Sequence, residues 1–175
     1  VECGVYKGHS MQVFLKEHLL DSNAIHRTFY LFDTFAGMPP RDPELDWKFK
    51  DKKRGNNYWN QARPLGVWLK GTMEEVQKCI QNVLREFPNW SSKATLKYIK
   101  GLIEDTLKIQ DNLPKEIAFL NLDTDFYKST LKSLQILVPL VVPSGVIVVD
   151  DYGTWNGAKE ATLEYFKERP SHIDN

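Results

Sequence analysis

The sequence predicts an α/β fold, a mostly parallel β-sheet with helices on both faces. Two observations carry this prediction. Short apolar stretches alternate along the chain with stretches whose apolar residues recur every three or four positions, which is the period of an amphipathic helix. Strands that alternate with helices are joined by right-handed crossovers, and these crossovers place the strands parallel in one sheet. A length of 175 residues fits a single domain over 1–175 with one core.

The first half of the chain supplies two strands and two helices. VECGV at 1–5 is the end of a strand, and the segment 8–22 that follows has its apolar residues at helical spacing. TFYLFD at 28–33 is rich in strand-forming residues and ends in an acid. A helix is expected over 73–87, because Thr72 and a glutamate three residues later match a capping box.

The second half alternates more regularly. Its strand segments are largely apolar, and GVIVVDD is apolar enough to indicate burial on both faces, as in a parallel sheet. The strands are expected at 95–101, 117–123 and 145–151, and the helices at 104–110, 129–142 and 157–168. The stretch 104–110 is long enough for only one or two helical turns.

Composition bounds the kinds of partner and the compartment. Lys plus Arg and Asp plus Glu both number 23, so the net charge is zero and nothing favours nucleic acid or an anionic membrane as partner. Cys3 and Cys79 form neither a metal-binding spacing nor a disulfide framework, and we therefore expect a cytoplasmic protein. Val1 reads as the inside of a strand, so we expect the chain to be a fragment, and a missing leader is left open.

The turn after the first strand and the acid after the second point to a bound cofactor. Gly4 and Gly8 permit a tight strand-to-helix turn, and the helix N-terminus beyond them attracts anionic groups. Their spacing, G-x-x-x-G, differs from the dinucleotide pattern G-x-G-x-x-G, which disfavours a pyrophosphate cradle. Asp33 stands where an acid binds a ribose diol in nucleoside-binding sheets. An ordinary glycine turn and an ordinary helix cap are the alternatives.

Two pairs of acids follow two strands that we expect to be neighbours. Asp123 and Asp125 follow the fourth strand, and Asp150 and Asp151 follow the fifth. Four carboxylates at one edge repel each other unless a cation lies among them. Carboxylate oxygens favour Mg²⁺ or Ca²⁺, and the lack of nearby histidine or cysteine disfavours zinc. A set of solvated caps is the alternative to a metal site.

Five stretches together resemble the macrocin O-methyltransferase family: VECGVYKGHS, LFDTFAGMPP, YIKGLIEDTL, LNLDTDFYKSTLKSL and SGVIVVDDYG. This family uses S-adenosylmethionine and a divalent metal to methylate sugar hydroxyls of natural products. The resemblance covers most of the chain outside 38–94, and E-x-G-x-x-x-G-x-S is also similar to catechol O-methyltransferase. It implies a Rossmann-like class I methyltransferase sheet, S-adenosylmethionine and Mg²⁺ as cofactors, and a sugar or another small polar molecule as acceptor.

The resemblance also implies roles for individual residues. The implied cofactor-binding residues are Glu2, Gly4, Gly8, Ser10, Asp33, Thr34, Gly101 and Asp123, with Leu102 or Ile103 near the adenine. The implied metal ligands are Asp123, Asp150 and Asp151. Asp125 and Asp123 are the candidate catalytic residues, and Asp125 is open as ligand, base or substrate contact. Lys128 is a second candidate base by nearness alone.

The stretch 38–70 breaks the alternation and is expected to be a substrate lid, with Arg41, Arg54, Arg63, Trp47, Tyr58 and Trp59 as candidate sugar contacts. Family members carry a segment before this point and usually more sheet after the last helix, so activity of this chain and a homo-oligomeric state are both left open. The alternatives weighed are an S-adenosylmethionine-binding module without transfer, a nucleotide-binding oxidoreductase on the same sheet, and a metal-dependent hydrolase.

Overall fold

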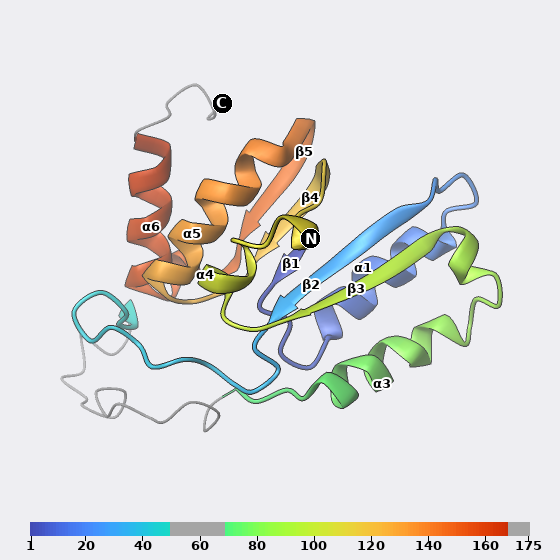
Figure 1. Ribbon diagram of the computed structural model, residues 1–175, viewed down its shortest axis with the longest axis horizontal. Coiled ribbons are helices and arrows are strands. Elements are labelled where there is room, and N and C mark those ends of the chain that lie inside the picture. The colour runs from blue at the N-terminus through green and yellow to red at the C-terminus, as the bar shows by residue number, and fades with distance from the viewer. Residues whose placement is uncertain (50–68, 168–175) are drawn as a thin grey trace.

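One parallel sheet organises the protein. The computed structural model describes residues 1–49 and 69–167. In these ranges five strands follow the order β3-β2-β1-β4-β5, and every pair is parallel (Figure 1). The strands are β1 (Glu2–Cys3), β2 (Arg27–Asp33), β3 (Ala94–Lys100), β4 (Ile117–Leu122) and β5 (Val141–Val149). The predicted parallel sheet is confirmed, and the first strand lies at its centre.

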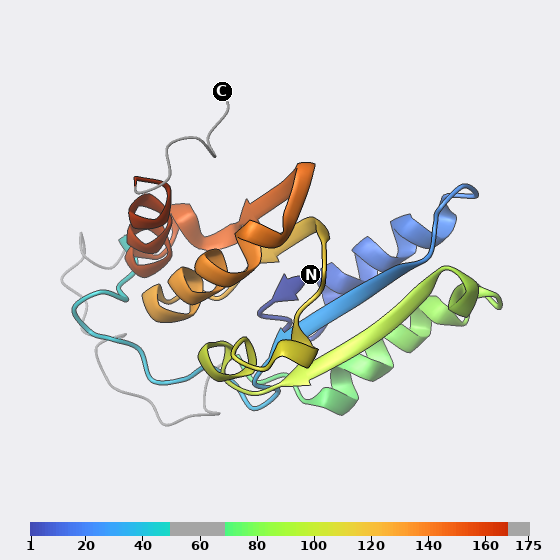
Figure 2. The ribbon, with the colours of Figure 1, turned by 45° about the horizontal axis from the view of Figure 1, so that its top comes forward.

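Helices cover both faces of this sheet (Figures 1 and 2). The helices are α1 (His9–Leu20), α3 (Met73–Leu84), α4 (Ile103–Thr106), α5 (Tyr127–Leu137) and α6 (Asn156–Lys167). Met11 and Leu15 of α1 and Ile80 of α3 form one buried cluster on the sheet. Leu134 of α5 and Tyr165 of α6 belong to a second cluster. The sheet is therefore the middle of three layers, as the alternating pattern predicted.

The end of one helix and the burial of the last strand depart from the sequence pattern. The helix expected over 129–142 ends at Leu137, because Pro139 lies in a 3₁₀ turn (Val138–Leu140) that leads directly into β5. Among the described strands β5 has β4 as its one neighbour, and Val146 exposes 52% of its surface. The expectation that 145–151 is buried on both faces is therefore wrong for the described residues, since a strand at the sheet edge is covered on fewer sides.

The capping box at the start of α3 is confirmed. The backbone N–H of Glu75 donates to the Thr72 hydroxyl over 3.2 Å, and the backbone N–H of Thr72 donates to the Glu75 carboxylate over 2.8 Å. Two backbone donors that the helix cannot satisfy are thereby paired. None of the helices in the described ranges has the length and apolar character needed to cross a bilayer.

The strand register places the carboxyl ends of neighbouring strands level with one another. Cys3 pairs with both Phe32 and Leu122, and Leu122 pairs with Val149. The next residue along each of these four strands is therefore Gly4, Asp33, Asp123 or Asp150. Ligands of open parallel sheets bind beyond this edge, where the strand order reverses on either side of the first strand.

Candidate functional site

A cavity of about 550 Å³ lies at the carboxyl edge of the sheet. Every strand contributes to it at or just after its end, through Gly4, Asp33, Gly101, Asp123 and Asp150. The size is that of a typical small-molecule site. The structure thus brings together the glycine turn, the acid of the second strand and both acidic pairs. The sequence predicted that the two acidic pairs meet.

The Asp33 carboxylate shapes the turn that follows β1. Its Oδ2 accepts the backbone N–H groups of Val5 at 2.7 Å and Tyr6 at 3.0 Å, and its Oδ1 accepts that of Phe35 at 2.7 Å. Tyr6 has a φ of 51°, a left-handed conformation that is uncommon outside glycine. The hydrogen bonds to Asp33 hold this conformation in place. Asp33 therefore stabilises the turn, in addition to the cofactor-binding role that the sequence predicts for it.

Gly4 allows the turn to approach the end of β4. Its φ is 86°, and a Cβ at this position would lie 1.8 Å from the backbone oxygen of Asp123. The Gly4 N–H donates to the Phe32 carbonyl over 2.9 Å, and the Asp123 N–H donates to the Cys3 carbonyl over 2.8 Å. Only glycine fits here. The cofactor turn and the first acid of the β4 pair are therefore packed backbone against backbone.

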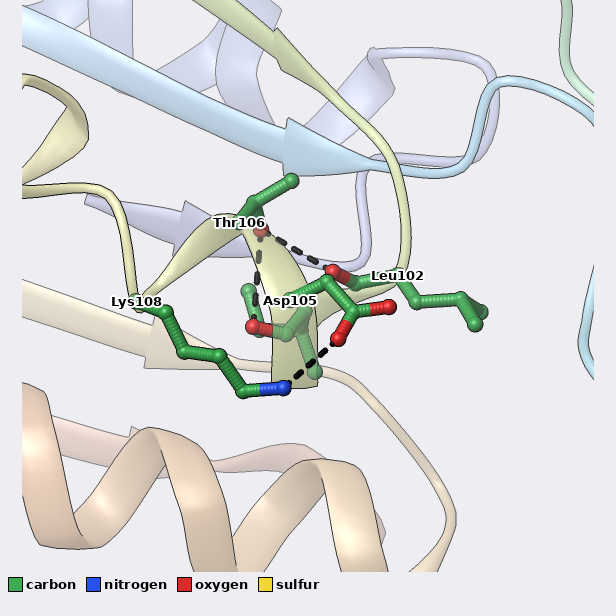
Figure 3. A network of polar contacts seen from close by, with 5 residues as sticks. Leu102, Asp105, Thr106 and Lys108 are labelled. Carbon is green, nitrogen blue, oxygen red and sulfur yellow. Dashed lines mark hydrogen bonds and ion pairs between the residues drawn. The ribbon is translucent and has the colours of Figure 1, made fainter.

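The far end of the cavity is formed by the turn into α4. Gly101, Leu102 and Ile103, which the resemblance places near an adenine, line it, and so does Glu104, which sequence reasoning missed. The Thr106 hydroxyl lies 3.1 Å from the Leu102 carbonyl, to which it donates (Figure 3). This bond fixes the short helix.

Gly101 has a φ of 146°, and a Cβ on it would lie 2.8 Å from Cγ2 of Thr106. The same view shows Lys108 paired with Asp105 over 2.8 Å at the surface. Such an exposed pair contributes little to stability, so the shape of this turn depends on Gly101 and Thr106.

Three carboxylates form a compact group on the other side of the cavity. Asp123, Asp125 and Asp151 each offer an oxygen, and these oxygens all lie within 4.8 Å of one another. Asp125 is buried and has a φ of 59°, which is unusual for a residue with a side chain. Asp150 lines the cavity but is not a member of this group. The group therefore contains Asp125 where the resemblance implies Asp150.

The electrostatics of the group favour a cation. Burial, with the charges of Asp150 and Asp151 added, raises the pKa of Asp123 to about 7. Burial and a hydrogen bond with Asp151 raise the pKa of Asp125 to about 10, against a smaller lowering effect of the Lys48 charge. A divalent cation would stabilise the ionised forms. Three carboxylates without nitrogen or sulfur donors fit a hard ion such as Mg²⁺.

Four of the candidate cofactor-binding and catalytic residues do not line the cavity. Glu2 is buried, its Oε1 accepts the Asn121 side-chain N–H over 3.2 Å, and its Oε2 has no hydrogen-bond partner among the described residues. Gly8 is the N-cap of α1 and packs against Val76. The remaining two, Ser10 and Lys128, are exposed.

The described part of the expected lid supplies one wall. Met38, Pro39 and Lys48 line the cavity together with Trp155, which precedes α6. No sequence pattern singles out Lys48 or Trp155. Two of the suggested sugar contacts, Arg41 and Trp47, do not line it: Arg41 donates to the Asp46 carbonyl over 2.8 Å, and Trp47 packs edge-on against Phe49. The others, Arg54, Tyr58, Trp59 and Arg63, lie outside the described residues.

The strand order and the cavity at its reversal define a Rossmann-like α/β domain. The family described as Macrocin-O-methyltransferase (TylF) matches residues 1–174, and the chain belongs to this family. The resemblance seen in the sequence is thereby confirmed.

Two curated relatives are similar to the chain. Demethyldecarbamoylnovobiocin O-methyltransferase of Streptomyces niveus is 29% identical over 167 residues. The 8-demethyl-8-(2,3-dimethoxy-alpha-L-rhamnosyl)-tetracenomycin-C 4'-O-methyltransferase of Streptomyces olivaceus is 25% identical over the same length. Both matches cover 94% of this chain and 56% of the relative, so the chain spans about half the length of the curated relatives it matches.

Solved structures agree with this placement. The O-methyltransferase NovP is 26% identical, with a TM-score of 0.60 and coverage of 99% of this chain and 64% of that one. The calicheamicin methyltransferase CalS11 has a TM-score of 0.69 at 16% identity, covering 93% of this chain and 62% of that one. The likeness to CalS11 supports the fold alone.

Proposed function

We propose that this chain carries the active site of an O-methyltransferase that takes a methyl group from S-adenosylmethionine and transfers it, with Mg²⁺, to a hydroxyl of a sugar or another small polar acceptor. One observation carries the proposal: the cofactor turn held by Asp33 and the carboxylate group of Asp123, Asp125 and Asp151 open into the same cavity. The two curated relatives are named as O-methyltransferases, which supports the same reaction class.

The cofactor end of the cavity fits a nucleoside. Asp33 has two carboxylate oxygens with about four acceptor directions in all, of which backbone N–H groups take three. The Thr34 hydroxyl lies 3.4 Å from Oδ1 of Asp33 but only 2.6 Å from the Gly37 carbonyl, so its one proton is directed to Gly37. One acceptor direction on Asp33 therefore remains for a ribose hydroxyl. Gly101, Leu102 and Ile103 would line the adenine.

The acidic end would hold the metal and the acceptor. A bound Mg²⁺ lowers the pKa of a coordinated hydroxyl and orients its oxygen. Asp123, Asp151 and either Asp150 or Asp125 would supply the carboxylate ligands. Three carboxylates with one divalent cation carry a net charge of −1, which favours the positively charged sulfonium. If Asp150 completes the ligand set, Asp125 is our candidate for receiving the hydroxyl proton, because it lies close to the other acids and the bound cation would keep its carboxylate ionised.

Calorimetric titration tests the proposal. S-adenosylmethionine and S-adenosylhomocysteine are titrated into the chain with Mg²⁺ and with a chelator, and NAD serves as the control nucleotide. We expect micromolar binding of both adenosyl ligands and no binding of NAD. Binding of NAD alone would instead support an oxidoreductase. If neither adenosyl ligand binds, the proposed function of this chain is wrong.

Methyl transfer from labelled S-adenosylmethionine to a panel of sugar acceptors then separates the enzyme from a binding module. We expect transfer that stops when the chelator removes the metal. Cofactor binding without transfer to any acceptor would favour the module. Transfer that persists in the chelator would contradict the metal role.

A further inference from the structure

Asp46 joins two distant parts of the chain at the rim of the cavity. It is a buried carboxylate, 2% exposed, in the loop segment that follows β2. Its Oδ1 accepts the backbone N–H of Tyr127 over 2.7 Å, across 81 positions of sequence, and its Oδ2 accepts that of Asp42 over 2.9 Å. Tyr127 is the first residue of α5, whose N-cap Phe126 offers no side-chain cap. Asp46 therefore supplies the missing cap from another segment.

The start of α6 closes the same junction. A Cβ added to Gly157 would lie 2.0 Å from Oδ1 of Asp46 and 2.6 Å from the backbone nitrogen of Tyr127. Asp46 and Tyr127 thus leave no space for a side chain at Gly157. Asn156 reinforces the contact, because its backbone N–H donates to the Trp47 carbonyl over 2.9 Å.

The Phe49 N–H donates to the Thr154 carbonyl over 3.1 Å, and Lys48 forms an antiparallel bridge with Trp155. These contacts continue the junction along the segment. The loop that contains Asp46 is thus held against the turn before α6 at several backbone positions.

Asp46, Tyr127 and Gly157, which meet here, each lie two positions along the chain from a residue that lines the cavity. Asp125 precedes Tyr127, Trp155 precedes Gly157, and Lys48 follows Asp46. The Lys48 ammonium lies 4.8 Å from the centre of the Trp155 ring. Asp46 itself does not line the cavity. Asp46 can therefore orient Asp125, Trp155 and Lys48, but it is not placed to contact a substrate.

We propose that Asp46 is a positioning residue for the acceptor side of the cavity: its carboxylate bonds the N-terminus of α5 and packs against Gly157 at the start of α6, and it thereby fixes Asp125, Lys48 and Trp155 relative to one another. The kinetic consequence rests on the proposed function. The structural consequence does not, because it can be measured without any substrate.

Hydrogen–deuterium exchange of the whole chain tests the structural part. The variants are Asp46→Ala, which removes both acceptors, Asp46→Asn, which keeps one, and Gly157→Ala, which displaces the carboxylate without changing its charge. Asp42→Ala is the matched control, since the Asp42 carboxylate accepts the N–H groups of Glu44 and Leu45 within its own turn.

We expect the amides of Tyr127, Phe49 and Asn156 to exchange about tenfold faster in Asp46→Ala and Gly157→Ala, and less so in Asp46→Asn. The amides of β2 and β3 should exchange at the wild-type rate in every variant. Wild-type exchange at all three amides in Asp46→Ala would overturn the proposal. Equal acceleration throughout the sheet would also overturn it, because Asp46 would then only stabilise the fold.

Kinetics supply the second readout. In Asp46→Ala the kcat of methyl transfer should fall by about tenfold or more, while the KM for S-adenosylmethionine and the Kd of S-adenosylhomocysteine stay within about twofold of wild type. Asp46→Asn should recover part of the kcat. A parallel loss of cofactor affinity would overturn the positioning role. Failure of the wild-type chain to bind the cofactor would sink the proposed function instead, and the exchange result would still decide the role of Asp46.

Discussion

The backbone N–H of Val5, just after β1, donates to Oδ2 of Asp33, the last residue of β2, over 2.7 Å. The acid at the end of β2 therefore holds the turn that follows β1. Since Tyr6 and Phe35, on which Asp33 also acts, both have positive φ values, the carboxylate stabilises backbone that is otherwise disfavoured.

Asp33→Asn should weaken cofactor binding and also loosen this turn. The amide offers one acceptor oxygen in place of two, so at least one backbone N–H group loses its partner. We expect the Kd of S-adenosylhomocysteine to rise by about tenfold or more and the free energy of unfolding to fall by about 1–2 kcal/mol. Calorimetry and thermal unfolding measure the two effects.

Asp21→Asn is the control for that change, because Asp21 also accepts a backbone N–H, from Asn23 at 2.9 Å, but does not line the cavity. An unchanged cofactor affinity in Asp33→Asn would remove the ribose assignment.

Asp123→Ala and Asp151→Ala should each lower the affinity for a divalent cation by about tenfold or more, because both carboxylates belong to the group that the structure assembles. Binding of S-adenosylhomocysteine should stay close to wild type. Titration with Mn²⁺, followed by its paramagnetic signal, measures the cation directly. Wild-type Mn²⁺ affinity in both variants would show that these acids do not hold a metal.

The same titration on Asp150→Ala and Asp125→Asn decides which carboxylate completes the ligand set. Resemblance to the family implies Asp150, which is exposed, whereas the compact group contains the buried Asp125. Whichever variant loses more Mn²⁺ affinity identifies the third ligand.

Much of the cofactor side follows from local sequence patterns. The alternation of strand and helix periods predicts a parallel sheet, and in the structure its register brings Gly4, Asp33 and Asp123 to one edge. The two acidic pairs are predicted to lie close together because they follow strands expected to be neighbours in this sheet. These features depend on short stretches whose spacing is visible in the chain.

The acceptor side could not be predicted in this way. Asp46 meets Tyr127 across 81 positions, from a segment without a hydrophobic period, so no local pattern indicates the contact. Lys48 and Trp155, which line the cavity, likewise meet from distant parts of the chain. The exposure of Val146 could not be predicted either, because the sequence of an apolar strand does not show whether the strand has one neighbour or two.

Glu2→Gln should stabilise the protein above neutral pH. Burial raises the pKa of Glu2 to about 8, against an ordinary value of 4.5 that applies once the chain unfolds. Between these values the folded state keeps a proton that the unfolded state releases, so the stability of the wild type falls as the pH rises. Glutamine imitates the protonated form at every pH.

Urea unfolding at pH 5 and pH 8 measures this linkage. The difference in the free energy of unfolding between Glu2→Gln and wild type should grow by about 2–4 kcal/mol from the lower to the higher pH. Glu44→Gln, at an exposed position, is the control and should show no such growth. A difference that does not change with pH would mean that Glu2 is not held in its neutral form.

Gly4→Ala should damage both ends of the cavity at once. The added Cβ would lie 1.8 Å from the backbone oxygen of Asp123, and the φ of 86° is unfavourable for alanine. The turn and the end of β4 must therefore move apart, and we expect about 3 kcal/mol of lost stability. Since the turn bonds to Asp33 and Asp123 directly follows β4, affinity for S-adenosylhomocysteine and for Mn²⁺ should both fall. Asp33→Asn should lower only the affinity for S-adenosylhomocysteine. Gly153→Ala is the matched control, because a Cβ there meets no atom within 4 Å. Loss of one affinity without the other in Gly4→Ala would show that the two ends are not joined through this backbone contact.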